Sequence, residues 1–429
     1  MYNRQLAYES LTAQRDHQSE ALVQLVHYLE AHSPFYQKHF KVHNIKASAI
    51  KSLDDLPLLP TTSKGDMQEH NWDFLCVPRN RIKEYTATSG TMGKPVTIAL
   101  TEHDLQRLAY NEEQSFRCAG GNAEDIYQLM LTLDRQFMAG MAYYSGIRQM
   151  GAAMVRTGPG LPAMQWDTIQ RLQSNSLVTV PSFLLKMIEW AEEHRIDLKN
   201  TPVQKAICIG ESLRRPDGTL NALGEKITAH WPLELYGTYA ATEMQTAFTD
   251  CKAGKGGHHQ PELIIVEILD EAGNALPDGA FGEVVITTLG IEGMPLLRYR
   301  TGDVCALYSE PCSCGKTSKR LSHVTGRLQQ MIKYKGTTLY PPAIFDMLNE
   351  LHYIQEYVVE VFTGSLGMDE LKLHLHTPLP VDDCERLMKP VLQSKLRVVP
   401  LLHFHAGSDM QALQFPPGSR KQVRFMDNR

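Results

Sequence analysis

The sequence has no long apolar stretch and no recognisable export signal. Its longest apolar runs, such as residues 129–133 and 263–268, are far shorter than the roughly 18 residues needed to cross a bilayer. The first twenty residues lack the apolar centre of a secretory signal and are too acidic for a typical transit peptide. We therefore expect a cytoplasmic protein with no membrane partner.

The sequence also lacks a strong excess of either charge. It has 43 basic and 48 acidic side chains, which gives a formal net charge of −5. This balance provides no general attraction for DNA or RNA, so nucleic acid is only a minor hypothesis. At roughly 100–200 residues per domain, the 429 residues predict two or three domains. The composition excludes collagen-like and disordered classes.

Cysteine is too scattered for a disulfide scaffold, with eight residues along the whole chain. Only Cys312 and Cys314 are close together in sequence. With Cys251 and His258 they offer three thiolates and one imidazole, a set that suits a closed, structural Zn²⁺ site. His259 is an alternative to His258, and unliganded thiols are the alternative to a metal site.

Short apolar runs alternate with helical stretches in the middle of the chain. This pattern is typical of an α/β layer with a largely parallel sheet. After Pro261, short alternating strands separated by turns predict an antiparallel, barrel-like subdomain. The apolar runs of the α/β layer are 127–133, 177–180, 205–209 and 234–236, and the later strands are 263–269 and 282–289.

The last hundred residues predict a small α+β domain. We therefore divide the chain into a large N-terminal α/β domain, residues 1–328, and a C-terminal α+β domain, residues 329–429. The predicted C-terminal strands are 331–334, 356–362, 370–376 and 401–405, and the predicted helices are 341–351 and 382–396.

A loop rich in Ser, Thr and Gly separates two strand-like runs within residues 84–100. Its small residues let backbone N–H groups approach phosphate oxygens, and Lys94 supplies a positive charge. It is not a Walker loop, because Gly90 and Gly93 have two residues between them and Pro95 follows the lysine. The alternative is a plain hairpin turn.

Residues 86–95, TATSGTMGKP, resemble the phosphate loop of the adenylate-forming superfamily of acyl-CoA synthetases, adenylation domains and luciferases. Other motifs of the superfamily follow in order, and the chain is similar to the phenylacetate-CoA ligase family over essentially its whole length. The resemblance implies a large adenylate-forming domain and a small mobile C-terminal domain. The loop residues that it assigns to ATP are Thr88, Ser89, Gly90, Thr91, Gly93 and Lys94.

Residues 239–243, YAATE, resemble the superfamily's aromatic-Gly-x-Thr-Glu segment, with Ala240 in place of the common glycine. The resemblance implies that Glu243 binds Mg²⁺, for which a carboxylate is a suitable hard ligand, and that Thr242 contacts the α-phosphate. Near Arg327, Gln329 stands where the family more often has Asp or Lys. Tyr239 is a further nucleotide contact implied by the YAATE segment. The other contacts implied are Gly210, Glu211 and Ser212 near adenine, Asp303 on the ribose hydroxyls, and Arg327 at the hinge.

Residues 418–424, GSRKQVR, resemble the segment that carries the superfamily's adenylation lysine. The resemblance places this role on Lys421, with Arg420 as the neighbouring cation. An ammonium brought in by a mobile domain stabilises the charge that develops on the α-phosphate and the departing pyrophosphate. Such preorganised stabilisation is worth roughly 10²–10³-fold in rate.

Residues 137–152 match the family's helix that enters the acyl site. The match places Phe137, Met138 and Ala139 beside the acyl group, where an aromatic wall suits an aryl acid; an ordinary core helix is the alternative. The segment around Gly336 is expected to form part of the coenzyme A tunnel. Related proteins also suggest the zinc ligands named above and a homodimer.

The resemblance implies an ATP-dependent acid–thiol ligase. It would activate an aromatic or arylacetic carboxylate as an acyl-adenylate and transfer it to coenzyme A, releasing AMP and pyrophosphate. One alternative is an adenylating enzyme that loads a carrier protein or an amine in natural-product biosynthesis. Another is a non-catalytic, zinc-stabilised nucleotide-binding protein.

Overall fold

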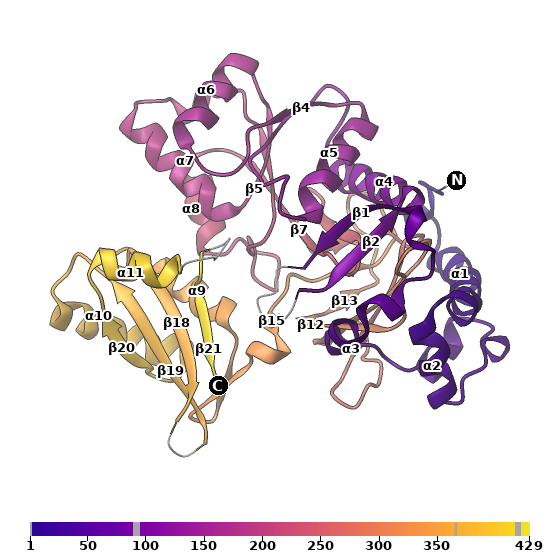
Figure 1. Cartoon of the computed structure of the whole chain (residues 1–429). Helices are drawn as coiled ribbons and strands as arrows, with labels where there is room; N and C mark the ends of the chain where they lie inside the picture. Colours follow the sequence, from indigo (N-terminus) through magenta and orange to yellow (C-terminus); the bar gives the residue numbers. More distant parts are fainter. Residues whose placement is uncertain (1, 89–94, 365–366, 417–421) are drawn as a thin grey trace. The chain divides into compact units, whose positions relative to one another are not determined.

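The computed structural model describes residues 2–88, 95–364, 367–416 and 422–429, which divide into two compact units (Figure 1). The first unit comprises Met1–Leu220 and Gly224–Val324, and the second comprises Asn221–Leu223 and Thr325–Arg429. The division falls slightly before the boundary at 328 that the sequence suggests. A short segment from the middle of the chain also groups with the second unit.

Two helices near the start of the chain, α1 (Leu11–His32) and α2 (Pro34–Val42), share Ser33. The Ser33 N–H donates to the Leu29 carbonyl and ends α1, while its hydroxyl accepts from the Tyr36 N–H and caps α2. The apolar spacing of Leu22, Leu25, Val26 and Leu29 predicts an amphipathic helix that ends at Ser33-Pro34. Helix α1 confirms this, and a second helix follows directly.

Residues 51–64 do not form the extended connection that their prolines suggest. Leu53–Leu58 form a 3₁₀ helix, η3, and Thr62 pairs with Tyr299 in an isolated parallel bridge. Helix α3 (Lys64–His70) starts directly afterwards with a capping box between Ser63 and Asp66. The other 3₁₀ helices are η1 (Leu6–Tyr8), η2 (Ala47–Ala49), η4 (Asn71–Phe74), η5 (Arg79–Arg81), η6 (Leu198–Asn200) and η7 (Leu328–Gln330).

A nine-stranded sheet forms the centre of the first unit, with the strand order β13-β14-β9-β8-β7-β6-β5-β3-β4. Strands β3 to β7 pair in parallel, which confirms the predicted α/β layer, and the remaining strands continue the sheet in antiparallel fashion. The strands are β3 (Ile126–Leu129), β4 (Ala153–Arg156), β5 (Ser176–Thr179), β6 (Lys205–Cys208), β7 (Glu234–Ala241), β8 (Thr246–Asp250), β9 (Gly257–His258), β13 (Leu307–Tyr308) and β14 (Arg320–Leu321).

Helices cover both faces of the parallel strands, as βαβ connections require. Figure 1 shows α4 and α5 on one side and α6 and α7 on the other. These helices are α4 (Glu102–Cys118), α5 (Met138–Met150), α6 (Pro162–Leu172) and α7 (Pro181–Glu193), and α8 (Ala222–His230) precedes β7.

Two smaller antiparallel pairings complete the first unit. Strands β1 (Ile82–Ala87) and β2 (Thr97–Thr101) form a hairpin, and β10 (Ile264–Leu269), β11 (Gly282–Thr288) and β12 (Tyr299–Cys305) pair in that order. Their inner side chains share one core with α1, in which Leu22, Leu29, Ile98, Val284 and Ile286 have no exposed surface. Each such burial is worth roughly 1.5–3 kcal/mol.

The second unit is built on a sheet with the strand order β20-β19-β18-β21. Strands β18 and β19 are antiparallel, while β20 and β21 pair in parallel with β19 and β18. Helices α9 and α10 cover one face with a separate apolar core. The elements are β15 (Gly326–Arg327), β16 (Ile332–Tyr334), β17 (Thr337–Leu339), α9 (Pro341–Glu350), β18 (Glu356–Thr363), β19 (Asp369–His376), α10 (Val381–Leu396), β20 (Leu401–Phe404), α11 (Gly407–Gln414) and β21 (Phe425–Asn428).

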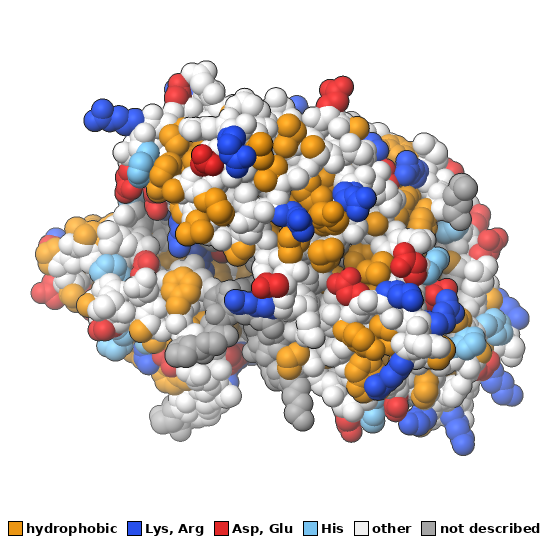
Figure 2. Space-filling model, turned by 45° about the horizontal axis from the view of Figure 1, so that its top comes forward, with side chains coloured by type: hydrophobic (Ala, Val, Ile, Leu, Met, Phe, Trp, Pro, Cys, Tyr) orange, Lys and Arg blue, Asp and Glu red, His pale blue; other side chains and the backbone are white. Residues whose placement is uncertain are grey.

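The predicted strands and helices of the C-terminal domain are confirmed, but α11, β17 and β21 are additional. The surface in Figure 2 shows charges of both signs scattered between apolar side chains, as the near balance of charge leads one to expect. In the part of the chain that the structure describes, no helix has the length and apolar character to span a membrane.

Candidate active site

Glu243 lies in the turn after β7, and only 8% of the residue is exposed. The Tyr299 hydroxyl lies 3.5 Å from its Oε1 atom, and Lys64 Nζ lies 3.8 Å from the same oxygen. Lys64 reaches this position because Thr62 pairs beside Tyr299 and Ser63 then caps α3. Lys64 and Tyr299 were not predicted as neighbours of Glu243, since no local sequence pattern connects them with this turn.

A buried guanidinium holds that turn in place. Arg107 on α4 donates hydrogen bonds to the carbonyls of Gln245, Leu263 and Leu289 at 2.8, 2.6 and 2.7 Å, and to the Thr246 hydroxyl at 3.1 Å. Burial lowers the pKa of Arg107 to about 10, which leaves it charged at neutral pH. Arg107 therefore joins the turn after β7 to the segments flanking β10 and β11.

Asp303 on β12 is 5% exposed and accepts a 2.7 Å hydrogen bond from the Tyr239 hydroxyl on β7. Burial, together with the charge of Asp303, raises the pKa of Tyr239 well above its ordinary value, so the phenol remains a donor. With the Tyr299 contact to Glu243, two tyrosines connect β7 and its turn to β12. The structure thus brings Tyr239 and Asp303, both predicted to face the nucleotide, into direct contact.

Thr88 joins the two strands, β1 and β2, that lead into and out of the predicted phosphate loop. Its N–H donates to the Val96 carbonyl, and its hydroxyl accepts from the Val96 N–H, each at 3.0 Å. The Ala87 N–H donates to the Gln136 carbonyl at 3.0 Å, which joins the hairpin to the segment before α5. The other predicted loop residues, Ser89, Gly90, Thr91, Gly93 and Lys94, lie outside the described residues.

The predicted acyl-site residues stand at the start of α5. Phe137 is the N-cap residue, Met138 is buried, and Ala139 is half-buried. Directly before them, Arg135 and Gln136 have φ values of 57° and 58°, a left-handed conformation that is costly for residues other than glycine. The entrance to α5 is therefore held in a strained conformation next to the β1–β2 hairpin.

The predicted adenine segment follows β6. Gly210 has a φ of 77°, a conformation that favours glycine. The Glu211 carboxylate accepts from the Ser182 N–H at 2.8 Å in the first turn of α7, and the Ser212 hydroxyl donates to the Arg214 carbonyl at 2.8 Å. The structure thus assigns Glu211 a helix-capping contact. Its contact with adenine stays a prediction.

The second unit carries the remaining predicted nucleotide and coenzyme residues. Gly336 has a φ of 78° and follows Lys335, with a φ of 47°, in the two-residue turn between β16 and β17. Positive φ at both positions is the geometry of a type I′ hairpin. Arg429 donates to the carbonyls of Gln329 and Met331 after Arg327, at 2.8 and 2.7 Å, so this segment is held by its backbone. The predicted adenylation residue Lys421 lies outside the described residues.

The four predicted zinc ligands converge in the first unit. The ligand atoms of Cys251, His258, Cys312 and Cys314 all lie within 4.8 Å of one another. The Sγ atoms of Cys251 and Cys312 are 3.5 Å apart, and Cys314 Sγ lies 3.4 Å from His258 Nε2. Two sulfurs on one tetrahedral zinc, with bonds of about 2.3 Å, are separated by about 3.8 Å, so the donor set and its spacing fit the ion.

The structure distinguishes the two neighbouring histidines. His258 faces the cysteines, whereas His259 Nε2 lies 2.6 Å from the Ile264 carbonyl and 3.3 Å from the Gln18 amide. Burial, assisted by Lys316 and Arg320, lowers the pKa of His258 to about 3, so its imidazole is neutral, as a metal ligand must be. His259 therefore makes hydrogen-bond contacts with Ile264 and Gln18, and it does not face the cysteines.

Comparison with known proteins identifies the family of this chain. Residues 51–292, more than half of the chain, match the family of AMP-binding enzymes. The phenylacetate-coenzyme A ligase of Thermus thermophilus is 28% identical over 374 residues, which cover 84% of this chain and 81% of that protein. The phenylacetate-coenzyme A ligase of Aromatoleum evansii is 28% identical over 353 residues, which cover 80% and 77%. The chain belongs to the family of AMP-binding enzymes.

A solved structure confirms the fold of this AMP-binding ligase. The crystal structure of 2-hydroxyisobutyryl-CoA ligase, in the postadenylation state with R3-HIB-AMP, matches with a TM-score of 0.85 at 21% identity. The match covers 99% of this chain and 92% of that one. The predicted fold class is therefore confirmed.

The family and these relatives together support an ATP-dependent, AMP-forming acid–CoA ligase, as the sequence resemblance implies. The same match does not favour the two alternatives, a carrier-loading adenylating enzyme and a non-catalytic nucleotide-binding protein.

Proposed function

We propose that this ligase activates an aromatic or arylacetic acid with MgATP and transfers the acyl group to coenzyme A. The observation that carries the nucleotide site is the pair of buried carboxylates, Glu243 and Asp303, which tyrosines link between β7 and β12. The substrate class is supported by the four curated relatives that are named phenylacetate-coenzyme A ligases.

In the proposed first step, a substrate carboxylate oxygen attacks the α-phosphorus of ATP and pyrophosphate leaves. Glu243 fits Mg²⁺ because it offers a hard oxygen in a largely buried turn that Arg107 anchors. When bound, Mg²⁺ offsets the charge on the phosphate oxygens. Thr242 and the Thr88–Lys94 loop hold the phosphates, and Lys421 stabilises the charge that develops at the α-phosphate.

Asp303 is proposed to accept hydrogen bonds from both ribose hydroxyls. The Tyr239 hydroxyl occupies Oδ2 at 2.7 Å, and this contact fixes the orientation of the carboxylate before nucleotide binds. Preorganisation of this kind lowers the cost of positioning the sugar. Arg327 and the Gly210–Ser212 segment are proposed as further nucleotide contacts.

In the proposed second step, the thiol sulfur of coenzyme A attacks the acyl carbon, the bond to AMP breaks, and the thioester forms. The turn at Gly336 is proposed to border the thiol path. Phe137, Met138 and Ala139 would then present apolar surface to the ring of an aryl acid. Arg135 and Gln136, the two residues with positive φ before α5, set the position at which this apolar surface starts.

We further propose that the Cys251, His258, Cys312 and Cys314 cluster holds a structural Zn²⁺. Three thiolates and a neutral imidazole form a closed set with no position left for substrate. The ion would tie the loop after β8 to the loop between β13 and β14, without a part in the chemistry. A cytoplasmic location and a homodimer are proposed on the family resemblance.

The decisive experiment measures pyrophosphate release with a panel of aryl, arylacetic and aliphatic acids, with and without coenzyme A. We expect release that depends on an aromatic acid, and AMP turnover that depends on coenzyme A. Release that needs no acid would contradict the ligase assignment. A preference for short aliphatic acids would contradict the proposed substrate class only.

Variants test the carboxylate roles in the same assay. We expect Glu243→Gln to lower kcat about 100-fold, the range for losing one preorganised electrostatic contact, and Asp303→Asn to raise mainly the KM for ATP. Glu271→Gln, at an exposed turn residue, is the matched control and should retain full activity. Equal activity of Glu243→Gln and the control would overturn the proposed metal role.

A further inference from the structure

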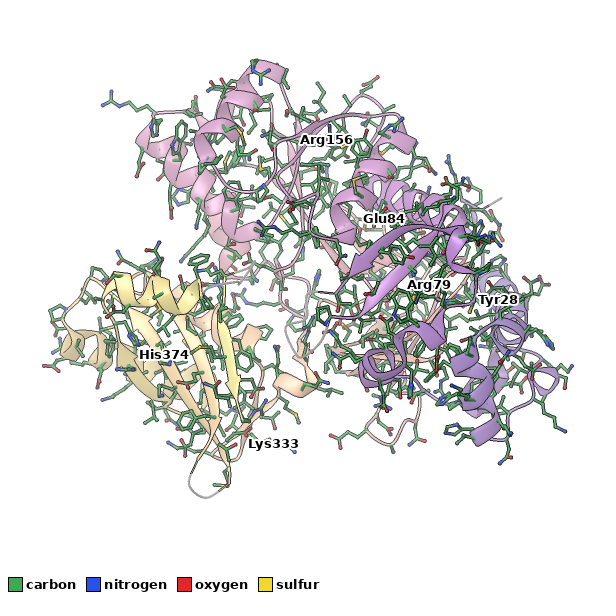
Figure 3. All side chains as sticks on the ribbon, viewed as in Figure 1. Tyr28, Arg79, Glu84, Arg156, Lys333 and His374 are labelled. Atoms are coloured by element: carbon green, nitrogen blue, oxygen red, sulfur yellow. The ribbon has the colours of Figure 1, made fainter. Side chains whose placement is uncertain are left out.

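The second unit carries a cluster of three histidines that the ligase chemistry does not use. Nitrogen atoms of His374, His403 and His405 all lie within 4.8 Å of one another. His374 is on β19, as Figure 3 shows, His403 is on β20, and His405 follows β20 directly. Their ring centroids are separated by 4.4–5.6 Å.

The sheet register explains why these rings meet. Strands β19 and β20 pair in parallel with His374 opposite His403, and the His405 N–H donates to the Leu375 carbonyl. Alternate residues of a strand share a face, so His403 and His405 stand on the same side as His374. Leu373 and its alternate neighbours fill the opposite, apolar face of β19.

A carboxylate orients the central ring of this cluster. His374 Nε2 lies 2.8 Å from Glu360 Oε2, and Lys372 Nζ lies 2.9 Å from the same oxygen. Asn428 Nδ2 donates to the other oxygen of this carboxylate, Oε1, at 2.8 Å, so polar side chains surround both oxygens. An ionised carboxylate only accepts, so His374 Nε2 carries the proton and Nδ1 presents a lone pair.

That lone pair faces the second imidazole. His374 Nδ1 lies 2.8 Å from His405 Nε2, the distance of a hydrogen bond in which His405 is the donor. For both nitrogens to bind one metal ion, the His405 ring must take its other neutral tautomer, in which the proton is on Nδ1 and Nε2 presents a lone pair.

We propose that His374, His403 and His405 form a second metal site, which takes a divalent transition ion such as Zn²⁺, Ni²⁺ or Cu²⁺. Imidazole nitrogens suit these ions, whereas Mg²⁺ and Ca²⁺ prefer oxygen. Metal-bound histidines typically donate their other N–H to a carboxylate, which is the contact between His374 and Glu360. His403 is exposed, so the ion has a path from solvent.

A Co²⁺ titration of the metal-stripped, full-length protein tests the proposal. Thiolate ligands give Co²⁺ an intense near-ultraviolet charge-transfer band, whereas an all-imidazole site gives only weak visible bands. We expect the wild type to bind one Co²⁺ at the cysteine cluster, which gives the thiolate band, and a second Co²⁺ that does not increase this band. We expect His403→Ala to lose the second ion. His352→Ala, at an exposed histidine outside the cluster, is the matched control and should retain it.

The positioning role of Glu360 is tested by affinity. Glu360→Gln keeps the three ligands, and we expect it to weaken Co²⁺ binding at this site about 10–100-fold at unchanged stoichiometry. Lys372→Gln, which removes the ion pair and leaves the carboxylate, should weaken it less. Far-ultraviolet circular dichroism without metal verifies that each variant is folded.

The outcome is independent of the ligase activity and of the cysteine cluster. Identical Co²⁺ stoichiometry and affinity in the wild type and His403→Ala would overturn the second site and leave a hydrogen-bonded histidine network. Loss of the thiolate band in Cys312→Ser, with the imidazole bands retained, would support two separate sites.

Discussion

The two units hold their polar side chains in different ways. In the first unit, Arg107, Asp303 and Glu243 are nearly inaccessible, and each contacts side chains or carbonyls from distant segments. In the second unit, Glu360 and the three histidines lie on one sheet face, around the exposed ring of His403. A buried polar group depends on every partner, because none is replaced by water, whereas an exposed group exchanges its partners for solvent. Substitutions in the first unit should therefore cost stability, and those on the second unit's open face should not.

The largest effect is expected at Arg107. Arg107→Met removes the guanidinium that donates to three buried carbonyls, of which that of Leu263 keeps a second donor, the Leu289 N–H, and it should lower the free energy of unfolding by about 3–5 kcal/mol. Urea denaturation measures the change. Gln106→Met, at an exposed position of the same helix, is the control and should stay within about 0.5 kcal/mol. Equal losses at both positions would contradict the anchoring role.

Removal of zinc should have the next largest effect. Replacing Cys312 and Cys314 with serine should remove one zinc per chain and make the Tm independent of added zinc. A ligand at 100 times its Kd adds about 2.7 kcal/mol to stability, and this contribution is what the variant loses. Metal analysis and thermal unfolding measure the two quantities. Cys118→Ser, whose side chain donates to the Thr249 carbonyl outside the cluster, should keep its zinc.

A smaller effect is expected where α4 and α5 pack together. A Cβ atom at Gly146 would lie 2.3 Å from the Glu112 Cβ atom, so Gly146→Ala must push the helices apart. We expect a loss of about 1–3 kcal/mol, measured by urea denaturation. Gly65→Ala, where the nearest atom is the Ser63 hydroxyl oxygen at 3.5 Å, should be neutral. A stable Gly146→Ala variant would show that this packing tolerates expansion.

The smallest effect is expected on the open face of the second unit. Without metal, His403→Ala should change the free energy of unfolding by less than about 0.5 kcal/mol, because the ring is exposed. Chemical denaturation in the presence of a chelator measures this. A large loss would remove the contrast between the units and show that the histidine network itself supports the sheet.

Local patterns predicted much of the fold. The alternation of apolar runs and helical stretches located β3, β5 and β6 to within a few residues, since side-chain periodicity is set by neighbours in sequence. The predicted elements of the second unit agree equally well. Strand β21 was missed because Phe425–Asn428 carries little strand character and gains its pairing only from β18.

The candidate site was predictable only in part. Motif resemblance named Glu243, Asp303 and Tyr239, and the cysteine and histidine residue types, together with the resemblance, suggested the metal ligands. Neither signal identified Arg107, Tyr299 or Lys64, because a single cation or phenol on a helix or strand belongs to no local sequence motif. These contacts join residues separated by more than fifty positions in sequence.

Sequence patterns were sufficient for most of the order of elements and for the family, since each depends on local periodicity or on short motifs. Packing decided which residues meet: that His258 and not His259 faces the cysteines, that Tyr239 contacts Asp303, and that three histidines share one sheet face. The physical reason is that strand register and helix docking are set by the sum of many buried contacts, which brings together side chains that no local rule connects.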